Sequence, residues 1–452
     1  MPLLDPLFRS EAVELIFSDR ATIQSMLDFE SALARAEART GVIPSPAAKA
    51  IESKCRAELF DLAAISTEAV TAGNLAIPLV KHLTALVAKK DKDAARFVHH
   101  GATSQDAIDT GRILQLRSAL DLISRDLESL AEPLGKLAQK HRNTLIAGRT
   151  WLQHALPTTL GYKIAGWLDA VLRHQSRLRE TRDRCLVLQF GGAVGTLAAL
   201  GTRGPDVASF LAAELKLTLP TLPWHAHRDR MAEVATTLGL CVGTLGKIAR
   251  DIALHMQTEL AEIFEPSTDG RGGSSTMPQK RNPVASAVIL SAAERVPGLV
   301  GTMLSAMIQE DERGLGGWHA EWETLPEIVR LTAGAMHHLT SIVPALEIDA
   351  DRMRKNLDQT HGLIFAEAVS MALTEKLGRA KAHELVQAAC ARARKENRPL
   401  RAILSADPRI APNLSPTDMD RLFDPHNYLG AAEEFVYRVV TASQAKIPAG
   451  HE

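Results

Sequence analysis

The sequence predicts an all-α protein with more than one domain. Aromatic residues make up only 4% of the chain, and β-branched residues seldom alternate with polar ones. Instead, Ala, Leu, Arg and Glu recur at helical spacing. The chain has 452 residues, which exceeds the roughly 100–200 residues of a typical domain. We therefore expect several helical units.

The first part of the chain predicts a set of short helices. The clearest is the segment TIQSMLDFESALARAEARTG, in which Gly41 is the expected stop signal. Turn-forming residues separate it from further short amphipathic pieces. We assign residues 1–111 to an N-terminal helical domain.

The middle of the chain predicts long helices. Residues 112–140 and 231–265 each carry an apolar residue every three or four positions and so place one stripe along a helix. A third long segment, 160–190, ends at a pair of glycines, and a fourth follows Pro283 and is interrupted by Pro297. We assign residues 112–350 to a central long-helix bundle. Its stripes are too extensive for one bundle to bury, which favours pairing with further copies of the chain.

The last hundred residues have a different character. From residue 351 onward the sequence is more charged, and prolines divide it into brief segments. We assign residues 351–452 to a small C-terminal helical domain.

Composition excludes several classes of partner. Lys and Arg total 52 against 53 Asp and Glu, so the net charge of −1 gives no pull toward nucleic acid or an anionic membrane. The N-terminus lacks the pattern of a signal peptide, and no uninterrupted apolar run of 18 residues occurs. Four scattered cysteines predict neither a zinc site nor a disulfide framework. We expect a cytoplasmic protein that needs no metal or organic cofactor and binds small molecules and copies of itself.

Three polar stretches stand out in this helical sequence. They are HHGATSQDAIDT at 99–110, GRTWLQHALPTT at 148–159 and GRGGSSTMPQKRNPVASA at 270–287. Hydroxyls and free amides at helix starts bind carboxylates well, and Thr103, Ser104, Thr158 and Thr159 suit that role. The alternatives are that these hydroxyls are N-caps, that His99 is an ordinary core or surface histidine, and that the glycine-rich stretch is a linker. The glycines do not form a P-loop, because the GxxxxGK[ST] pattern is absent.

Together the three stretches carry a family resemblance. GSSTMPQKRNP resembles the signature GSSxMPxKxNP of the fumarase/aspartase superfamily, and the other two resemble that superfamily's remaining motif regions in the same order. The resemblance covers essentially the whole chain. It implies a three-domain, all-α homotetramer with a twenty-helix core, in which each active site takes its three motif regions from three subunits. It also implies a reversible β-elimination next to a carboxylate-bearing carbon.

The resemblance assigns roles to individual residues. Ser274, the first serine of the signature, is expected to be the base that removes the α-proton, and His99 and His154 are further candidate catalytic residues whose part in proton transfer stays open. Removing that proton builds charge on a carboxylate, which preorganised donors must hold. The candidate substrate-binding residues are Thr103, Ser104, Trp151, Thr158, Ser275, Lys280, Asn282 and Arg313.

The sequence departs from the superfamily at two positions. Most members read GRTH in the second motif, and a glutamate seven residues after the signature lysine orients that histidine; here Trp151 and Ala287 occupy these places. A departing amine gains greatly from such a general acid, whereas a carboxylate, with a pKa near about 4, leaves as the anion. Because it lacks both residues, the chain resembles the lactone-forming cycloisomerases of the superfamily, which act on an unsaturated tricarboxylate.

Other interpretations stay open at this point. One alternative is a fumarate-releasing lyase of the adenylosuccinate or argininosuccinate type, but with Trp151 and Ala287 it would lack the general acid that protonates the departing amine. A non-catalytic, crystallin-like protein would have no need for the intact Ser274, Lys280 and Asn282. Trp151 as a pocket wall competes with Trp151 as core filler, and Arg313 as a carboxylate clamp competes with Arg313 in a surface ion pair.

Overall fold

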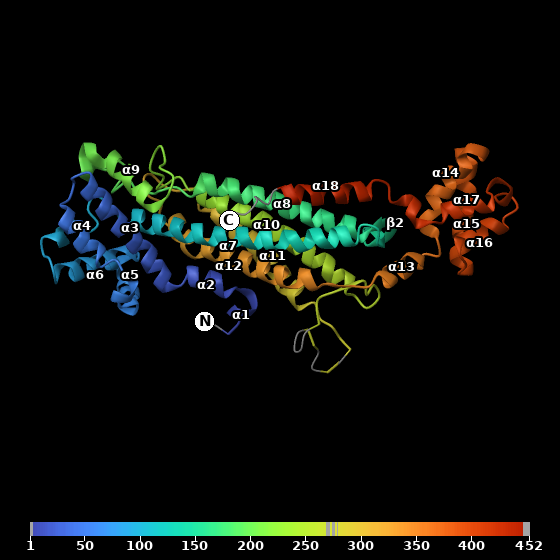
Figure 1. The fold of residues 1–452 in the computed structure, drawn as a ribbon, viewed down its shortest axis with the longest axis horizontal. Helices are drawn as coiled ribbons and strands as arrows, with labels where there is room; N and C mark the ends of the chain where they lie inside the picture. The colour runs from blue at the N-terminus through green and yellow to red at the C-terminus, as the bar shows by residue number, and fades with distance from the viewer. Residues whose placement is uncertain (1–2, 268–271, 274–275, 278, 446–452) are drawn as a thin grey trace. The chain divides into compact units, whose positions relative to one another are not determined.

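The computed structural model describes residues 3–267, 272–273, 276–277 and 279–445. The chain divides into two compact units. Unit 1 comprises Met1–Glu128, Arg173–Gly246 and Val288–His338, and unit 2 comprises Ser129–Leu172, Lys247–Ala287 and Leu339–Glu452. Helices dominate both (Figure 1), which confirms the predicted all-α class. The division into domains at residues 111 and 350 stays a prediction.

Five long helices have residues in both units. They are α7 (Ser104–Lys140), α8 (Leu160–Cys185), α10 (Asp229–His255), α11 (Val284–Ser305) and α12 (Gly317–Ile342). The apolar stripe predicted for residues 112–140 is buried along α7, where Ile113, Leu120 and Leu134 have no exposed surface. The predicted long helices are thus confirmed, with some changed ends.

Unit 1 also contains the shorter helices of the N-terminal part. They are α1 (Asp5–Phe8), α2 (Glu11–Ile16), α3 (Asp19–Arg39), α4 (Ser45–Glu52), α5 (Leu62–Ala72), α6 (Ala76–Ala88) and α9 (Gly204–Leu215). Helix α3 begins where Ser18 Oγ accepts a hydrogen bond from Ala21 N at 3.3 Å. It ends before Gly41, whose φ of 72° confirms the predicted stop.

The long helices pack against one another inside unit 1 through apolar stripes and a few buried polar pairs. Thr181 on α8 and Thr237 on α10 share a hydrogen bond of 2.9 Å between their hydroxyls. Between α8 and α10, His174 Nε2 also lies 2.7 Å from Thr244 Oγ1, and between α8 and α7, Gln175 Nε2 donates to Leu127 O at 3.2 Å. The segments of these helices in unit 1 therefore form a bundle, as predicted.

Unit 2 contains a β-hairpin that the sequence did not predict. Strands β1 (Leu145–Thr150) and β2 (Gln153–Thr159) pair antiparallel, with an irregularity at Gly148. A Cβ at Gly148 would approach Leu156 O to 2.6 Å. The turn consists of Trp151 and Leu152, with φ of 52° and 62°. Two left-handed residues match the twist of a hairpin, although glycine or asparagine usually fills them.

Unit 2 also holds the C-terminal helices and a second strand pair. The helices are α13 (Ala350–Asp358), α14 (Ala366–Leu377), α15 (Arg379–Glu396), α16 (Leu400–Ala406), α17 (Pro416–Leu422) and α18 (Ala432–Ala445). Strand β3 (Ile263–Phe264) pairs antiparallel with β4 (Glu347–Ile348). Buried apolar residues between Val369 and Leu422 form their own core cluster.

Two predicted helix ends and one predicted helix interruption were wrong. Helix α10 stops at His255, ten residues early, because Ala261 takes a φ of 50° and Glu262 N bonds back to His255 O. Helix α8 stops at Cys185, before the glycine pair. Helix α11 continues through Pro297 instead of being interrupted there.

Two described helices, α10 and α11, are long and apolar enough to cross a membrane, judged by length and composition alone. The core helix of a globular protein meets the same criterion. In α10 the apolar residues Val234, Leu238 and Ile252 are fully buried within the protein, so protein packing accounts for its hydropathy.

A buried acid in unit 1 predicts a specific pH dependence. Glu37 on α3 has no exposed surface, and neither carboxyl oxygen has a hydrogen-bond partner among the residues that the structure describes. Burial, followed by the nearby Glu30, raises its pKa from 4.5 to about 9. The unfolded chain loses this proton near pH 4.5, so the stability that the neutral acid contributes is complete below that pH and is lost as pH rises toward 9.

We therefore expect Glu37→Gln to raise the free energy of unfolding at pH 8 by about 1–3 kcal/mol and to change it little at pH 5. Urea unfolding at the two pH values measures the difference. Glu11→Gln, at an exposed position on α2, is the matched control. A Glu37→Gln protein that is less stable than the wild type at pH 8 would contradict this expectation.

Candidate active site

The first motif region lies at the start of α7 in unit 1. Arg313 donates hydrogen bonds from Nη2 to Thr103 Oγ1 at 3.2 Å and from Nε to Gln105 Oε1 at 3.0 Å. Arg313 is exposed and forms no ion pair with any residue that the structure describes. A hydroxyl and a guanidinium that touch and face solvent can bind a carboxylate together. The neighbouring Ser104 is half-buried.

Asp106 holds this region in place. Its carboxylate is fully buried and accepts five hydrogen bonds. The donors are Thr103 N at 3.0 Å, Gly191 N at 3.0 Å, Gly192 N at 2.9 Å, Gln189 Nε2 at 3.2 Å and His225 Nε2 at 2.7 Å. The sequence reasoning missed this residue. An acidic residue three positions after Thr103 is a capping-box spacing, which is the signal that could have found it.

A second buried network lies one helical turn further along α7. Arg228 donates to both oxygens of Asp109, at 2.7 and 3.1 Å, and to both oxygens of Glu321. Trp318 Nε1 also donates to Asp109, at 3.0 Å. Burial alone would lower the pKa of Arg228, but the carboxylates of Asp109 and Glu321 outweigh it and hold the pKa above its usual value. Three distant chain segments meet at this one cation.

In unit 1, His99 pairs with the carboxylate of Glu30. Its Nδ1 lies 2.6 Å from Glu30 Oε1, and both side chains are largely buried. Burial lowers the pKa of His99, but the charge and hydrogen bond of Glu30, with a further contribution from Asp106, raise it overall. His99 is therefore better suited to carry a proton than to remove one.

The second motif region is the hairpin of unit 2. Trp151 at its tip is 98% exposed, which rules out the core-filler alternative for this chain. Thr159 Oγ1 accepts a hydrogen bond from Tyr162 N at 3.1 Å and thus caps α8, so the N-cap alternative holds for Thr159. Thr158, one residue earlier, is half-buried in β2.

His154 lies on β2 opposite Arg149 on β1. Its Nδ1 is enclosed and has no hydrogen-bond partner in the described part of the chain. Burial, and then the charge of Arg149, lower the pKa of His154. His154 is therefore neutral at pH 7 and can accept a proton.

A buried acid fixes the strand that carries Arg149. Glu262 has no exposed surface and accepts hydrogen bonds from Arg149 Nη1 and Nη2, at 3.0 and 2.7 Å. His255 Nδ1 lies 2.7 Å from Glu262 Oε2, and Asn356 Nδ2 donates to Oε1 at 2.8 Å. Burial opposes ionisation, but these partners prevail and lower the pKa of Glu262 to about 2. The ionised Glu262 thus fixes Arg149, and with it strand β1 of the hairpin, through a charged hydrogen-bond network.

The signature segment is described only in part. Ser274 and Ser275 lie outside the described residues. Asn282 N donates to Gly272 O at 2.9 Å, and a Cβ on Gly272, where φ is 70°, would lie 2.7 Å from Asn282 O. This contact joins the two ends of the segment and requires glycine. Lys280 is exposed.

The end of the signature is anchored to unit 2. Arg281 bonds Glu347 through both Nη1 and Nη2 at 2.8 Å. Glu265 is buried and accepts hydrogen bonds from Ala285 N and Ser286 N at the start of α11, at 3.0 and 2.8 Å. An acid at a helix N-terminus satisfies free amides and the helix dipole. Ala287 lies exposed in the same first turn.

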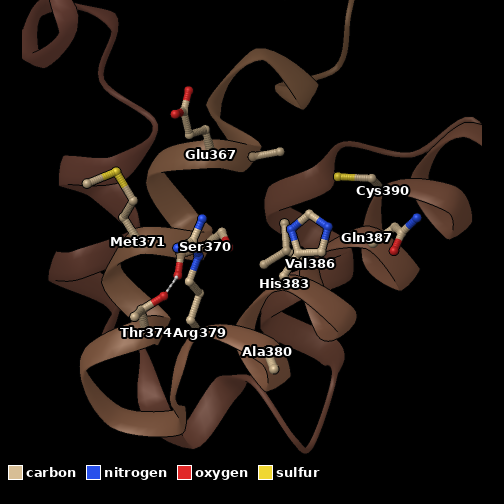
Figure 2. Close-up of a pocket in the computed structure, with 11 residues that line it drawn as sticks. Glu367, Ser370, Met371, Thr374, Arg379, Ala380, His383, Val386, Gln387 and Cys390 are labelled. Carbon is tan, nitrogen blue, oxygen red and sulfur yellow. Dashed lines mark hydrogen bonds between the residues drawn. The ribbon is translucent and has the colours of Figure 1, made fainter.

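The predicted site residues thus divide between the units. Unit 1 holds His99, Thr103, Ser104 and Arg313, and unit 2 holds Trp151, His154, Thr158, Lys280 and Asn282. Among the predicted site residues that the structure describes, only Thr103 and Arg313 are joined by a hydrogen bond. A cavity of about 1260 Å³ between α14 and α15, where Met371 and His383 project (Figure 2), contains none of them. No cluster of potential metal ligands occurs among the described residues.

Comparison with known proteins decides the family. A model of the lyase family matches residues 9–298, and a model described as adenylosuccinate lyase C-terminus matches residues 362–439. The chain belongs to the fumarase/aspartase superfamily.

Members of this superfamily resemble the chain over nearly its whole length. A 3-carboxy-cis,cis-muconate cycloisomerase of Pseudomonas aeruginosa is 56% identical, over 98% of this chain and 96% of the relative. The crystal structure of the 3-carboxy-cis,cis-muconate lactonizing enzyme of Pseudomonas putida is 55% identical, with a TM-score of 0.93 over 98% of this chain and 99% of that one. A nitrosuccinate lyase of Streptomyces davaonensis is 42% identical, over 99% of this chain and 96% of the relative.

Proposed function

We propose that this superfamily member is a 3-carboxy-cis,cis-muconate cycloisomerase of protocatechuate breakdown, which converts that tricarboxylate to 4-carboxymuconolactone. The observation that carries the proposal is the residue at the tip of the hairpin. Where most members have the histidine that protonates a leaving group, this chain presents Trp151, and Ala287 replaces that histidine's partner. Full-length relatives above 50% identity that bear this name support it.

The proposed chemistry needs one proton carrier. In the lactonising direction an oxygen of one carboxylate forms a bond to an alkene carbon, and Ser274 delivers a proton to the neighbouring carbon, α to a carboxylate. In reverse, Ser274 takes that proton, the C–O bond breaks and the electron pair leaves with the carboxylate. The leaving group is a weak base, so no second acid is required.

The polycarboxylate needs several donors. We assign the exposed pair of Thr103 and Arg313 to one carboxylate, because a guanidinium held against a hydroxyl is already oriented. Lys280 and Asn282 at the fixed end of the signature segment suit another. Ser104, Thr158 and Ser275 complete the proposed binding set.

A single chain leaves the hairpin tip uncovered. Trp151 is 98% exposed and Leu152 74%, and exposed apolar side chains of this size usually mark an interface. We propose that the protein is a cytoplasmic homotetramer with a twenty-helix core, in which the three motif regions of each active site come from three subunits and Trp151 forms a wall of the pocket. The domains are 1–111, 112–350 and 351–452.

The proposed function is tested by absorbance. We expect purified protein to lower the ultraviolet absorbance of 3-carboxy-cis,cis-muconate, because ring closure breaks the conjugated diene. Nuclear magnetic resonance of the product will then show the lactone. Unchanged absorbance at micromolar enzyme would refute the assignment.

The paired loss at Trp151 and Ala287 makes a further prediction. We expect Trp151→His alone to create no lyase activity on an amine substrate, because the glutamate that orients such a histidine is absent at Ala287. Fumarate release from adenylosuccinate or argininosuccinate measures this. The matched double variant Trp151→His/Ala287→Glu is the informative comparison, and measurable release by the single variant would contradict the argument.

A further inference from the structure

A second cavity, of about 580 Å³, lies inside unit 1. Helices α3, α7, α11 and α12 contribute to its lining. Its apolar wall includes Phe17, Met26, Ile108 and Trp322, and its polar wall includes Arg112 and Arg330. A cavity of this size and mixed lining matches the dimensions of small-molecule sites. It contains none of the residues assigned above to catalysis or substrate binding.

Most charges around this cavity already have partners. Glu327 is held by Arg295 at 2.7 Å and by Arg9 at 2.9 Å. Arg330 Nε lies 3.1 Å from Glu14 Oε1. The remaining lining acids, Asp19 and Glu323, are exposed to solvent, which screens their charge.

Arg112 is the exception. It is half-buried, and its guanidinium donates only to neutral oxygens, Gln115 Oε1 at 3.1 Å and Trp322 O at 3.2 Å. It forms no ion pair with any residue in the described part of the chain. Its carbon Cζ lies 5.7 Å from the centroid of the Phe17 ring, and Cζ of Arg330 lies 5.5 Å from the same centroid. Two guanidinium groups therefore flank one aromatic ring at the cavity wall.

Arg112 is thus a half-buried cation with no carboxylate in direct contact among the described residues. Burial, and then the like charge of Arg330, lower the pKa of Arg112 to about 10, against the smaller raising effect of the Asp109 and Glu321 charges. A guanidinium remains charged at neutral pH even so, and partial burial of a cation without a direct counter-ion is costly. An anion entering the cavity would offset that cost.

We propose that this cavity is a binding site for a small organic carboxylate, held by Arg112 while its apolar body lies against Phe17 and Trp322. The guanidinium has a planar face of donors that matches a carboxylate. The aromatic wall favours a ring over an alkyl chain or a bare inorganic anion. The class of ligand is thus an aromatic or cyclic monocarboxylate. This inference does not depend on the proposed function.

The test uses benzoate as the probe and its neutral isostere benzamide as the chemical control. Binding to the full-length protein is measured by isothermal titration and by the shift in melting temperature. Arg112→Met removes the charge and keeps most of the side-chain volume. Arg117→Met is the matched control, because Arg117 lies on the same helix and its guanidinium likewise donates to a carbonyl, Leu215 O at 2.6 Å.

We expect benzoate to bind with a Kd below about 1 mM, and benzamide to bind at least tenfold more weakly. Arg112→Met should weaken benzoate binding at least tenfold, and Arg117→Met less than twofold. Equal benzoate affinity in the Arg112→Met and wild-type proteins would overturn the proposal, because the probe would then occupy another carboxylate site. Absence of benzoate binding to the wild-type protein would overturn it as well.

A second readout covers the case in which Arg112→Met does not fold. Benzoate, but not benzamide, should change tryptophan fluorescence in the wild-type protein, and Trp322→Phe should remove that change. A fluorescence response that persists in Trp322→Phe would count against this cavity as the site.

Discussion

Ser274→Ala is expected to reduce kcat for lactone formation by a factor of at least about 10³, with the oligomer intact. Proton transfer by a positioned group contributes about 10²–10⁴-fold, and in the proposed mechanism no other acid shares the task. The alanine variant retains Thr103, Arg313, Lys280 and Asn282 for binding. We therefore expect KM to change much less than kcat.

The control for this variant is Ser267→Ala. Ser267 precedes the signature segment, and only its backbone N–H donates to Glu347, at 3.0 Å, so its hydroxyl can be removed without loss of that bond. Steady-state kinetics and size-exclusion chromatography measure both variants. Near-normal turnover by Ser274→Ala would remove this serine from the mechanism.

The second large effect is expected at Arg228. Arg228→Met leaves Asp109 and Glu321 buried together without their shared cation, and both carboxylates lie almost entirely out of solvent. Breaking a buried ion pair by removing one partner typically costs about 3–5 kcal/mol. We expect the free energy of unfolding to fall by that amount and activity to fall with it, because the same network adjoins Gln105 beside Arg313.

An exposed arginine provides the comparison. Arg184 pairs with Glu233, with side-chain exposures of 55% and 31%, and exposed pairs contribute about 0–1 kcal/mol. The free energy of unfolding of Arg184→Met, measured in urea, should thus lie within about 1 kcal/mol of the wild-type value. If Arg228→Met were equally mild, the buried network would not be a main support of the first motif region.

Sequence periodicity was sufficient for the long helices because their burial is one-sided and regular. The stripe on α7 repeats every three or four residues, so its buried face could be read directly. The end of α10 could not be predicted from periodicity, because the apolar pattern continues past His255 into β3. The helix ends where Ala261 takes a left-handed φ of 50° and Glu262 N bonds back to His255 O, a turn without the usual glycine or asparagine signal.

The hairpin was missed for a local reason. Its turn residues are Trp151 and Leu152, which adopt left-handed φ without being glycine or asparagine, so the usual turn signal is absent. The strained turn keeps Trp151 exposed at the tip. When a motif residue such as Trp151 adopts a backbone conformation that its residue type disfavours, we expect function and not folding to have determined its identity.

The sequence predicted which residues belong to the candidate site more fully than it predicted the contacts between them. The first motif identified Thr103, the family resemblance outside the motifs identified Arg313, and the structure joins the two residues. They did not identify Asp106, Glu262 or Glu265, three buried acids; Asp106 and Glu265 bond backbone amides of the motif regions, and Glu262 bonds the side chain of Arg149. Most partners of these acids are distant in the sequence, although the Thr103–Asp106 spacing was a local signal. A single acid in a helical pattern is usually a solvated surface residue.

The central claim is that this protein closes a lactone and does not expel an amine. The most direct measurement is kcat/KM on three substrates in parallel: 3-carboxy-cis,cis-muconate by loss of diene absorbance, and adenylosuccinate and argininosuccinate by release of fumarate. The account predicts efficient turnover of the first and no fumarate above background from the other two. Fumarate release from either, with unchanged absorbance of the muconate, would contradict it.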